Sequence, residues 1–416
     1  MATLIKNISS LVTINADGKP YKCGEEMSDI GEIQNGAILF DEKILFVGTT
    51  DDALRYIYNN HIQVQETIDA SGKTVLPGFV DSHTHFVFAG NRSFEFARRL
   101  RGVTYQQIAK EGGGILTTMK ATRQASLDEL VANGLKLANS ALRYGTTTVE
   151  IKSGYGLSFD SEIRQLEAIA VLKEIAHQNV VPTFLGAHDF PPEYANNRDG
   201  YVELICEEML PAVAEKQLAT FCDAFVDEGY YTTEQGRKIF IRAKELGLKI
   251  KAHADELANV AATELAAEVG AISADHLLFI SDRGIAALKT AGTVATLLPG
   301  TAYFTRLPYA PARKLIESCA IVALATDCNP GSCFTENIQM ILSLAVINMK
   351  MTAEEALTAA TLNAAAALCL SSQVGSLEVG KQADLLIASV SSYTDLFYHF
   401  GINHIQSVFV KGKKVV

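Results

Sequence analysis

The sequence predicts an α/β protein: a TIM (β/α)8 barrel with a small β domain built from both ends of the chain. From residue 79 to about residue 370, short apolar strand segments alternate with capped helical segments, a pattern typical of parallel α/β proteins. Outside this stretch the chain reads as short alternating strands and turns. We therefore expect a barrel of residues 79–373 and a small domain of residues 1–78 and 374–416.

Eight barrel strands can be counted, and eight β–α units over this length fit a TIM barrel with insertions. The predicted strands are Phe79–His85, Thr146–Lys152, Val180–His188, Phe221–Asp227, Leu248–Ala254, Ala271–His276, Thr293–Leu297 and Ile321–Asp327. A doubly wound open sheet is the competing arrangement. It is disfavoured because no glycine fingerprint follows the first strand.

Three helices between or after these strands have readable ends. The segments 126–145, 232–247 and 352–370 each begin with Ser or Thr, followed three residues later by Glu or Gln, which is the pattern of a capping box. The first two end at a glycine, as helices commonly do. The third is rich in alanine and is expected to run to near Leu370.

The two flanks predict strands that belong to one small domain. Ala37–Phe40 and Ile44–Val47 are apolar runs separated by a polar turn, and Ala383–Ile387 and Val408–Val415 repeat this style near the C-terminus.

Composition excludes several classes of function. The 416 residues are 48% hydrophobic and 20% charged, as in ordinary globular proteins, and the formal net charge is −11. This acidity argues against a nucleic-acid partner, since phosphate binding needs a basic face. No apolar run is long enough to span a membrane, and residues 1–6 lack the pattern of a signal peptide. The seven cysteines form no C-x-x-C pair, so we expect reduced thiols and a cytoplasmic protein.

The most informative motif is His83-Thr84-His85 at the end of the first predicted strand. Residues i and i+2 of a strand share a face, so the two imidazoles are expected to point the same way. Two converging imidazoles are half of a site for a borderline metal ion such as zinc or iron. The alternative is that His83 and His85 are simply polar residues in the turn after a strand and bind no metal.

Further histidines favour the metal site. His188, His253 and His276 also fall at predicted strand ends, and in a TIM barrel these ends meet on the catalytic face. His83, His85 and His253 with the strand-8 aspartate, Asp327, make a set of three nitrogens and one oxygen. The fourth strand ends in Asp227-Glu228 without a lysine that could bridge two metals, so we expect one zinc or iron ion. Lys152 is then expected to be a structural or supporting cation.

These residues carry a resemblance. The segment Pro77–His85 with the late aspartate resembles the amidohydrolase superfamily, which implies metal-dependent hydrolases on TIM barrels with a flanking β-sandwich. Four later segments resemble the imidazolonepropionase family within it; they are residues 88–96, 112–115, 150–157 and 184–188. The resemblance implies opening of the ring of 4-imidazolone-5-propanoate to N-formimino-L-glutamate, in histidine degradation.

Carried over residue by residue, the resemblance implies a metal site and a substrate pocket. The metal would be held by His83, His85, His253 and Asp327. The pocket would be lined by Arg92, Tyr155, His188, Glu256, Asn329, Gly331 and Ser332. The family often has glutamine at position 256 and threonine at position 332, so Glu256 is either an acid–base group or a hydrogen-bond partner only.

The expected chemistry assigns three catalytic residues. A metal ion lowers the pKa of water from about 15.7 towards 7 and so gives hydroxide for attack on the ring carbonyl. His276 and Asp327 are expected to hold the water and accept its proton, and Glu256 or His276 to protonate the leaving nitrogen. Arg92 offers a planar fork for the propionate carboxylate, although by itself it would read as one more surface charge beside three further arginines.

Two alternatives stay open. A barrel deaminase acting on a nucleobase or another cyclic amidine would share the metal ligands and differ in its release of ammonia. A non-catalytic scaffold would tend to lose ligands that this chain retains. The expected partner is a small-molecule substrate, and the superfamily resemblance suggests a homodimer.

Overall fold

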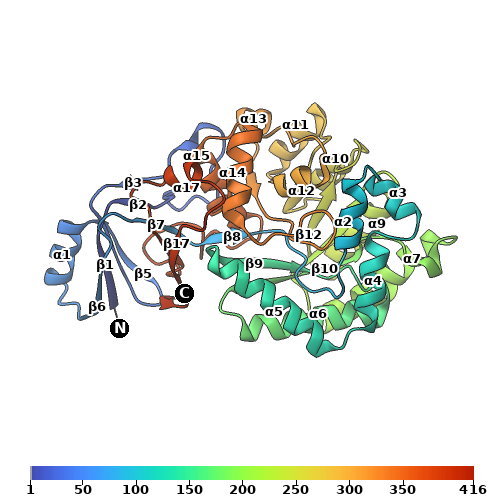
Figure 1. The fold of residues 1–416 in the computed structure, drawn as a ribbon, viewed down its shortest axis with the longest axis horizontal. Coiled ribbons are helices and arrows are strands. Elements are labelled where there is room, and N and C mark those ends of the chain that lie inside the picture. Colours follow the sequence, from blue (N-terminus) through green and yellow to red (C-terminus); the bar gives the residue numbers. More distant parts are fainter. Residues whose placement is uncertain (1) are drawn as a thin grey trace.

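The computed structural model describes residues 2–416, and its centre is a parallel eight-stranded sheet curled into a barrel (Figure 1). The strands follow the order of the sequence: β8 (Phe79–Asp81), β9 (Thr146–Lys152), β10 (Asn179–Ala187), β11 (Phe221–Val226), β12 (Lys249–Ala254), β13 (Ser273–His276), β14 (Val294–Leu297) and β15 (Val322–Leu324). The first and last strands meet just beyond their ends, through a parallel bridge between Thr84 and Cys328. The predicted barrel is therefore confirmed.

Helices surround the barrel because each connection must return to start the next parallel strand. They are α2 (Ser93–Leu100), α3 (Tyr105–Lys110), α4 (Ile115–Gln124), α5 (Leu127–Arg143), α6 (Phe159–Ile175), α7 (Arg198–Leu204), α8 (Leu210–Glu215), α9 (Thr233–Glu245), α10 (Ala262–Glu268), α11 (Asp282–Ala291), α12 (Pro299–Thr305), α13 (Ala312–Glu317), α14 (Ile338–Met349), α15 (Ala353–Ala359) and α16 (Leu362–Ala366). A 3-10 turn (Pro192–Tyr194) and a π-helical turn (Ile205–Met209) complete them. No helix within residues 2–416 has both the length and the apolar character needed to cross a membrane.

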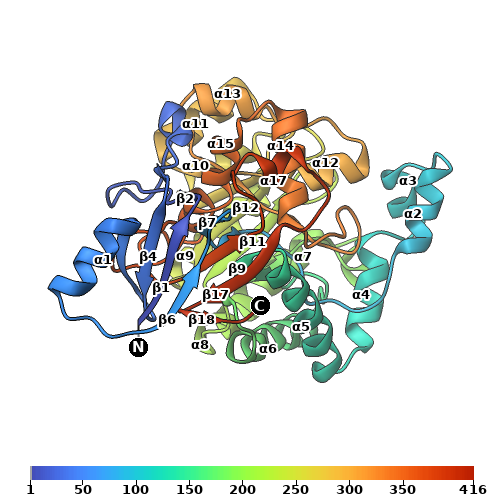
Figure 2. The same cartoon turned by 60° about the vertical axis from the view of Figure 1, so that its left-hand side comes forward.

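The small domain consists of two sheets that draw on both ends of the chain (Figure 2). One has the order β5-β4-β1-β6, and the other β18-β17-β16-β7-β2-β3. Their strands are β1 (Ala2–Ile8), β2 (Ser10–Val12), β3 (Glu32–Ile33), β4 (Gly36–Phe40), β5 (Ile44–Thr49), β6 (Val64–Asp69), β7 (Thr74–Pro77), β16 (Leu385–Ala388), β17 (Ile405–Val410) and β18 (Lys413–Lys414). Helix α1 (Thr50–Asn59) packs on the first sheet, whereas the short helices η1 (Gly24–Ser28) and α17 (Asp395–Tyr398) contact helices of the barrel.

An apolar core joins these two sheets. Phe40 from one sheet meets Phe409 from the other edge-to-face, with ring centroids 5.5 Å apart, and both side chains are buried. Aliphatic side chains such as Ile38 and Leu385 extend the same cluster. The expected small β domain from both termini is thus present, and the domain boundaries drawn from the sequence stay a prediction.

Two barrel strands end three or more residues before their predicted ends, and two others, β10 and β11, end one residue early. The first barrel strand ends at Asp81 and the last at Leu324, so His83, His85 and Asp327 lie in the segments after the strands. A side chain replaces backbone pairing between the first and last strands at this point. The buried Asp81 carboxylate accepts hydrogen bonds from the backbone N–H and the hydroxyl of Thr326. His85 still points with His83 because its N–H donates to Cys328 O (2.9 Å), which keeps this segment extended.

The helices behave as expected except for the last. Both reciprocal hydrogen bonds of the capping box form at Ser126 and at Thr232. The predicted helix 352–370 is instead two short helices, α15 and α16, and this part of the prediction is wrong. The Ala360 carbonyl accepts from Val80 N of the barrel (2.9 Å), so the backbone leaves the helical path at Thr361.

Candidate metal centre and active site

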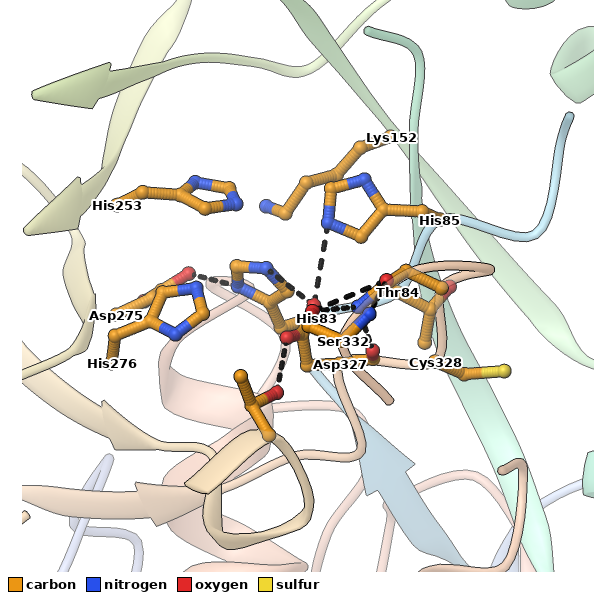
Figure 3. Close-up of polar contacts among 12 residues, drawn as sticks. His83, Thr84, His85, Lys152, His253, Asp275, His276, Asp327, Cys328 and Ser332 are labelled. Atoms are coloured by element: carbon orange, nitrogen blue, oxygen red, sulfur yellow. Dashed lines mark hydrogen bonds and ion pairs between the residues drawn. The ribbon is translucent and has the colours of Figure 1, made fainter. Parts of the chain in front are cut away.

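Three histidines and one aspartate converge at the C-terminal mouth of the barrel (Figure 3). The ligand atoms of His83, His85 and His253 lie within 4.8 Å of one another. One carboxylate oxygen of Asp327 lies 3.5 Å from His83 Nε2 and 3.4 Å from His85 Nε2. A second, overlapping set within the same limit consists of His83, His276 and Asp327. The tertiary structure thus brings together all four residues that the sequence proposed as ligands.

Two buried carboxylates orient the rings. Asp275 lies 2.6 Å from His83 Nδ1, and Asp223 lies 3.1 Å from His253 Nδ1. A carboxylate accepts, so each Nδ1 carries the proton and each Nε2 keeps a free lone pair for a metal. This carboxylate–histidine arrangement is the usual support for metal-binding imidazoles.

The donor atoms fit one metal ion. His83 Nε2 has no hydrogen-bond partner among residues 2–416, although it is buried. Burial lowers the pKa of His83 and of His85 well below the usual range, so both rings are neutral near pH 7. Neutral imidazoles beside a buried carboxylate are the ligands that zinc and similar ions prefer.

Lys152 serves as a buried counter-ion. Its ammonium group lies 2.6 Å from Glu150 Oε1 and 2.8 Å from Asp223 Oδ2, and in Figure 3 its end is drawn between His85 and His253. Burial alone lowers the pKa of Lys152, but the charges of Asp223 and Glu150 raise it above the ordinary value. Lys152 therefore stays charged, which disfavours its carboxylation and agrees with its expected role as a supporting cation.

Two groups next to the ligands, Glu256 and His276, can exchange protons. Glu256 Oε2 lies 3.6 Å from His276 Nε2. Burial lowers the pKa of His276 to about 3, and burial with the nearby charge of Asp327 raises the pKa of Glu256 well above its ordinary value. The hydroxyl of Thr301 donates to Asp327 Oδ2 and fixes that carboxylate.

These residues face a cavity of about 910 Å³. Of the predicted substrate-binding residues, those that line it are Arg92, Tyr155, His188, Glu256, Asn329 and Ser332. The cavity is also lined by His85, His253, His276 and Asp327. Phe96 and Phe304 also line the cavity and stack with their ring centroids 4.8 Å apart, and the Arg99 guanidinium lies 4.6 Å from the centroid of the Phe304 ring.

Arg92 is buried, so it is no surface charge. It is 5% exposed, and its Nε donates to Glu95 Oε2 over 2.8 Å. Glu95 also accepts from Gly114 N and from the Thr117 hydroxyl, each at 3.0 Å, so this carboxylate is fully engaged. The cavity therefore contains a buried guanidinium with a fixed orientation.

Gly331, unlike the other predicted substrate-binding residues, does not line the cavity. A Cβ at this position would lie 2.2 Å from Arg92 Nη1, so the glycine backbone packs directly against the guanidinium. Asn329 Oδ1 accepts from Gly331 N and Ser332 N, each at 2.8 Å, which holds this turn beside Asp327.

Sequence reasoning missed the residues that support the site. Asp223, Asp275 and Lys251 are fully buried within β11, β13 and β12, and Lys251 Nζ lies 3.6 Å from Asp275 Oδ2. Charged residues in the middle of buried strands are rarely tolerated without partners, and this signal could have identified them.

Comparison with known proteins identifies the family of this chain. The sequence model of the amidohydrolase family matches residues 74–415. A protein named imidazolonepropionase from Alkaliphilus oremlandii is 47% identical over 414 residues, covering 99% of this chain and 97% of the relative. Another with that name, from Thermoanaerobacter pseudethanolicus, is 48% identical over 415 residues, covering 99% of this chain and 98% of the relative.

Solved structures show the same fold at low identity. A zinc-containing adenosine deaminase from Xanthomonas campestris superposes with a TM-score of 0.71 at 20% identity, covering 99% of this chain and 92% of the other. A guanine deaminase from C. acetobutylicum gives 0.69 at 17% identity, covering 100% of both chains. The barrel, the converging ligands and the near-full-length relatives together show that this chain belongs to the amidohydrolase family and, within it, to the imidazolonepropionases.

Proposed function

We propose that this chain is a metal-dependent hydrolase that opens the ring of 4-imidazolone-5-propanoate to give N-formimino-L-glutamate in histidine degradation. The observation that carries the proposal is the identity of 47–49% over 99% of the chain with relatives named imidazolonepropionase. Because structural neighbours below 25% identity share only the fold, they do not favour the deaminase alternative.

The cavity supports binding of a small anionic ring. Buried Arg92 offers its guanidinium to the propionate carboxylate, and charge-assisted pairs of this kind are strong where water is excluded. Tyr155 and His188 lie beside the ligand histidines: the His188 ring stacks on His85 at 5.2 Å and lies 5.1 Å from Tyr155. The ring of the substrate is thereby expected to sit between these aromatic groups and the metal ligands.

We assign the metal to His83, His85, His253 and Asp327, with zinc and iron both suited to this ligand set. When bound, such an ion is a Lewis acid that polarises a carbonyl oxygen and lowers the pKa of water towards 7.

The protein's own groups handle the protons. Ring opening forms a C–O bond from water to the ring carbonyl carbon and breaks the adjacent C–N bond, whose electron pair goes to nitrogen. We assign to Asp327 and His276, whose side-chain atoms lie within 4.8 Å of each other, the roles of holding the water and accepting its proton. We assign to Glu256, whose Oε2 lies 3.6 Å from His276 Nε2, the return of a proton to the leaving nitrogen.

Product analysis tests the proposal. Incubation of the metal-loaded protein with 4-imidazolone-5-propanoate should give a product with the mass of the substrate plus one water, without stoichiometric ammonia. Ammonia released in step with turnover, or an inert imidazolone together with consumption of a nucleobase, would replace this proposal by the deaminase. The homodimer and the cytoplasmic location stay predictions.

A further inference from the structure

The loop that carries Tyr155 is held by two side chains of the following helix. This loop, residues 153–157, connects β9 to α6. Glu162 Oε2 accepts from Gly154 N at 3.0 Å, and Glu162 Oε1 accepts from Gly156 N at 2.7 Å and Leu157 N at 2.8 Å. Gln165 Oε1 accepts from Tyr155 N at 3.1 Å. Side chains on α6 therefore accept from the backbone N–H of every residue from 154 to 157.

The sequence explains why these two residues act together. Glu162 and Gln165 are three positions apart, so they lie on one face of α6. Both are fully buried, and Gln165 Nε2 also donates to Val87 O at 2.6 Å, which ties the loop to the chain after β8. A buried carboxylate is costly, and an apolar residue would pack at less cost. The three hydrogen bonds from the loop to Glu162 therefore account for a buried carboxylate at this position.

The same loop fixes a histidine of the cavity. The Gly154 carbonyl lies 3.0 Å from His188 Nδ1. A carbonyl can only accept, so His188 carries its proton on Nδ1, and Nε2 keeps its lone pair. Gly154 has φ +110°, and a Cβ there would lie 2.9 Å from Leu185 O and 3.0 Å from His188 Nδ1, so only glycine permits this approach.

We propose that Glu162 and Gln165 are positioning residues that hold loop 153–157 so that Tyr155 faces the substrate and His188 presents Nε2 as a hydrogen-bond acceptor. The acceptor suits a substrate ring that carries an N–H group, which an imidazolone has. A ring with that nitrogen methylated cannot donate there. The identity of the ring rests on the proposed function, whereas the hold on the loop does not.

The test combines a tautomer measurement with kinetics on Glu162→Gln. The amide is the same size but offers one accepting oxygen where the carboxylate offers two, and its NH2 group faces backbone donors. We expect the ¹⁵N spectrum of the histidine-labelled wild-type protein to show His188 protonated on Nδ1, with its signals assigned by their loss in His188→Gln. In Glu162→Gln the two tautomers should mix. The value of kcat/KM should fall by about 10- to 100-fold, as for the loss of a hydrogen bond to a charged group.

Two controls separate positioning from general stability. Asp384→Asn removes another buried carboxylate, one that accepts from Lys411 N at 2.8 Å far from the cavity, and should lower Tm without changing kcat/KM or the His188 signals. In a His188→Gln background, Glu162→Gln should lower kcat/KM by less than in the wild type, because the part of its effect that acts through His188 is already lost. Metal content should be unchanged throughout.

Three results would overturn the inference. They are a wild-type His188 protonated on Nε2, His188 signals unchanged in Glu162→Gln, or full additivity with His188→Gln. If the wild-type protein does not turn over the imidazolone, the proposed function fails, and the His188 spectra still decide whether the loop is held as inferred.

Discussion

Arg92 is the residue whose replacement tests the substrate-binding model most directly. Its side chain is 3% exposed, and its partner Glu95 is 4% exposed, so the pair is shielded from water. Truncating one member of a desolvated, hydrogen-bonded charge pair costs about 2–5 kcal/mol. If Arg92 binds the propionate, Arg92→Met should lower kcat/KM by roughly 30- to 4,000-fold, at about 1.4 kcal/mol per factor of ten.

The same substitution should also lower stability. Without Arg92 the buried Glu95 carboxylate has no cation, and breaking a buried ion pair typically lowers the free energy of unfolding by about 3–5 kcal/mol. The loss should be smaller here, because Gly114 N and the Thr117 hydroxyl still donate to Glu95. Arg92→Lys keeps a positive charge without the planar fork, so it should recover only part of the loss in kcat/KM.

The assay is steady-state kinetics on protein with matched metal content, with Tm measured in parallel. Arg98→Met, in the helix that follows Arg92, is the control, because Arg98 is half-exposed and pairs with Glu111 at the surface. It should leave kcat/KM within about twofold, as surface pairs contribute little. Unchanged kinetics in both Arg92 variants, at wild-type metal content, would refute the assignment of Arg92 to the substrate carboxylate.

The remaining predictions concern the metal and the core. Elemental analysis of active protein should find about one zinc or iron ion per chain, and two tightly held ions with carboxylated Lys152 would contradict the ligand assignment. Asp275→Asn should weaken metal binding about 10- to 100-fold in a chelator competition, because the carboxylate that orients His83 is lost; an affinity equal to that of the wild type would remove Asp275 from this role. Phe409→Ala should cost about 3–5 kcal/mol of unfolding free energy in a denaturant titration, since this ring fills the core between the two sheets; a loss below about 1 kcal/mol would show that the two sheets do not depend on this contact.

The sequence by itself determined the barrel and most of the candidate site. Strand alternation, helix caps and turns are local features, so β9 was predicted at its observed bounds and the box at Ser126 forms as expected. The ligands could be located because the ends of parallel barrel strands meet at one mouth, whichever helices lie between them. His83, His85, His253 and Asp327 were therefore identifiable before any contact was known.

Tertiary structure alone decided what orients those residues. His83 depends on Asp275, which is 192 positions away, and no local pattern links the two. The first barrel strand ends at Asp81, whose carboxylate accepts from Thr326 in the segment after the last barrel strand, and α15 ends where the Ala360 carbonyl accepts from Val80 N. The burial of Arg92 against Gly331 likewise needs two distant loops to meet. Long-range hydrogen bonds and burial set these features, since a chain's local preferences cannot specify which distant group will satisfy a buried charge.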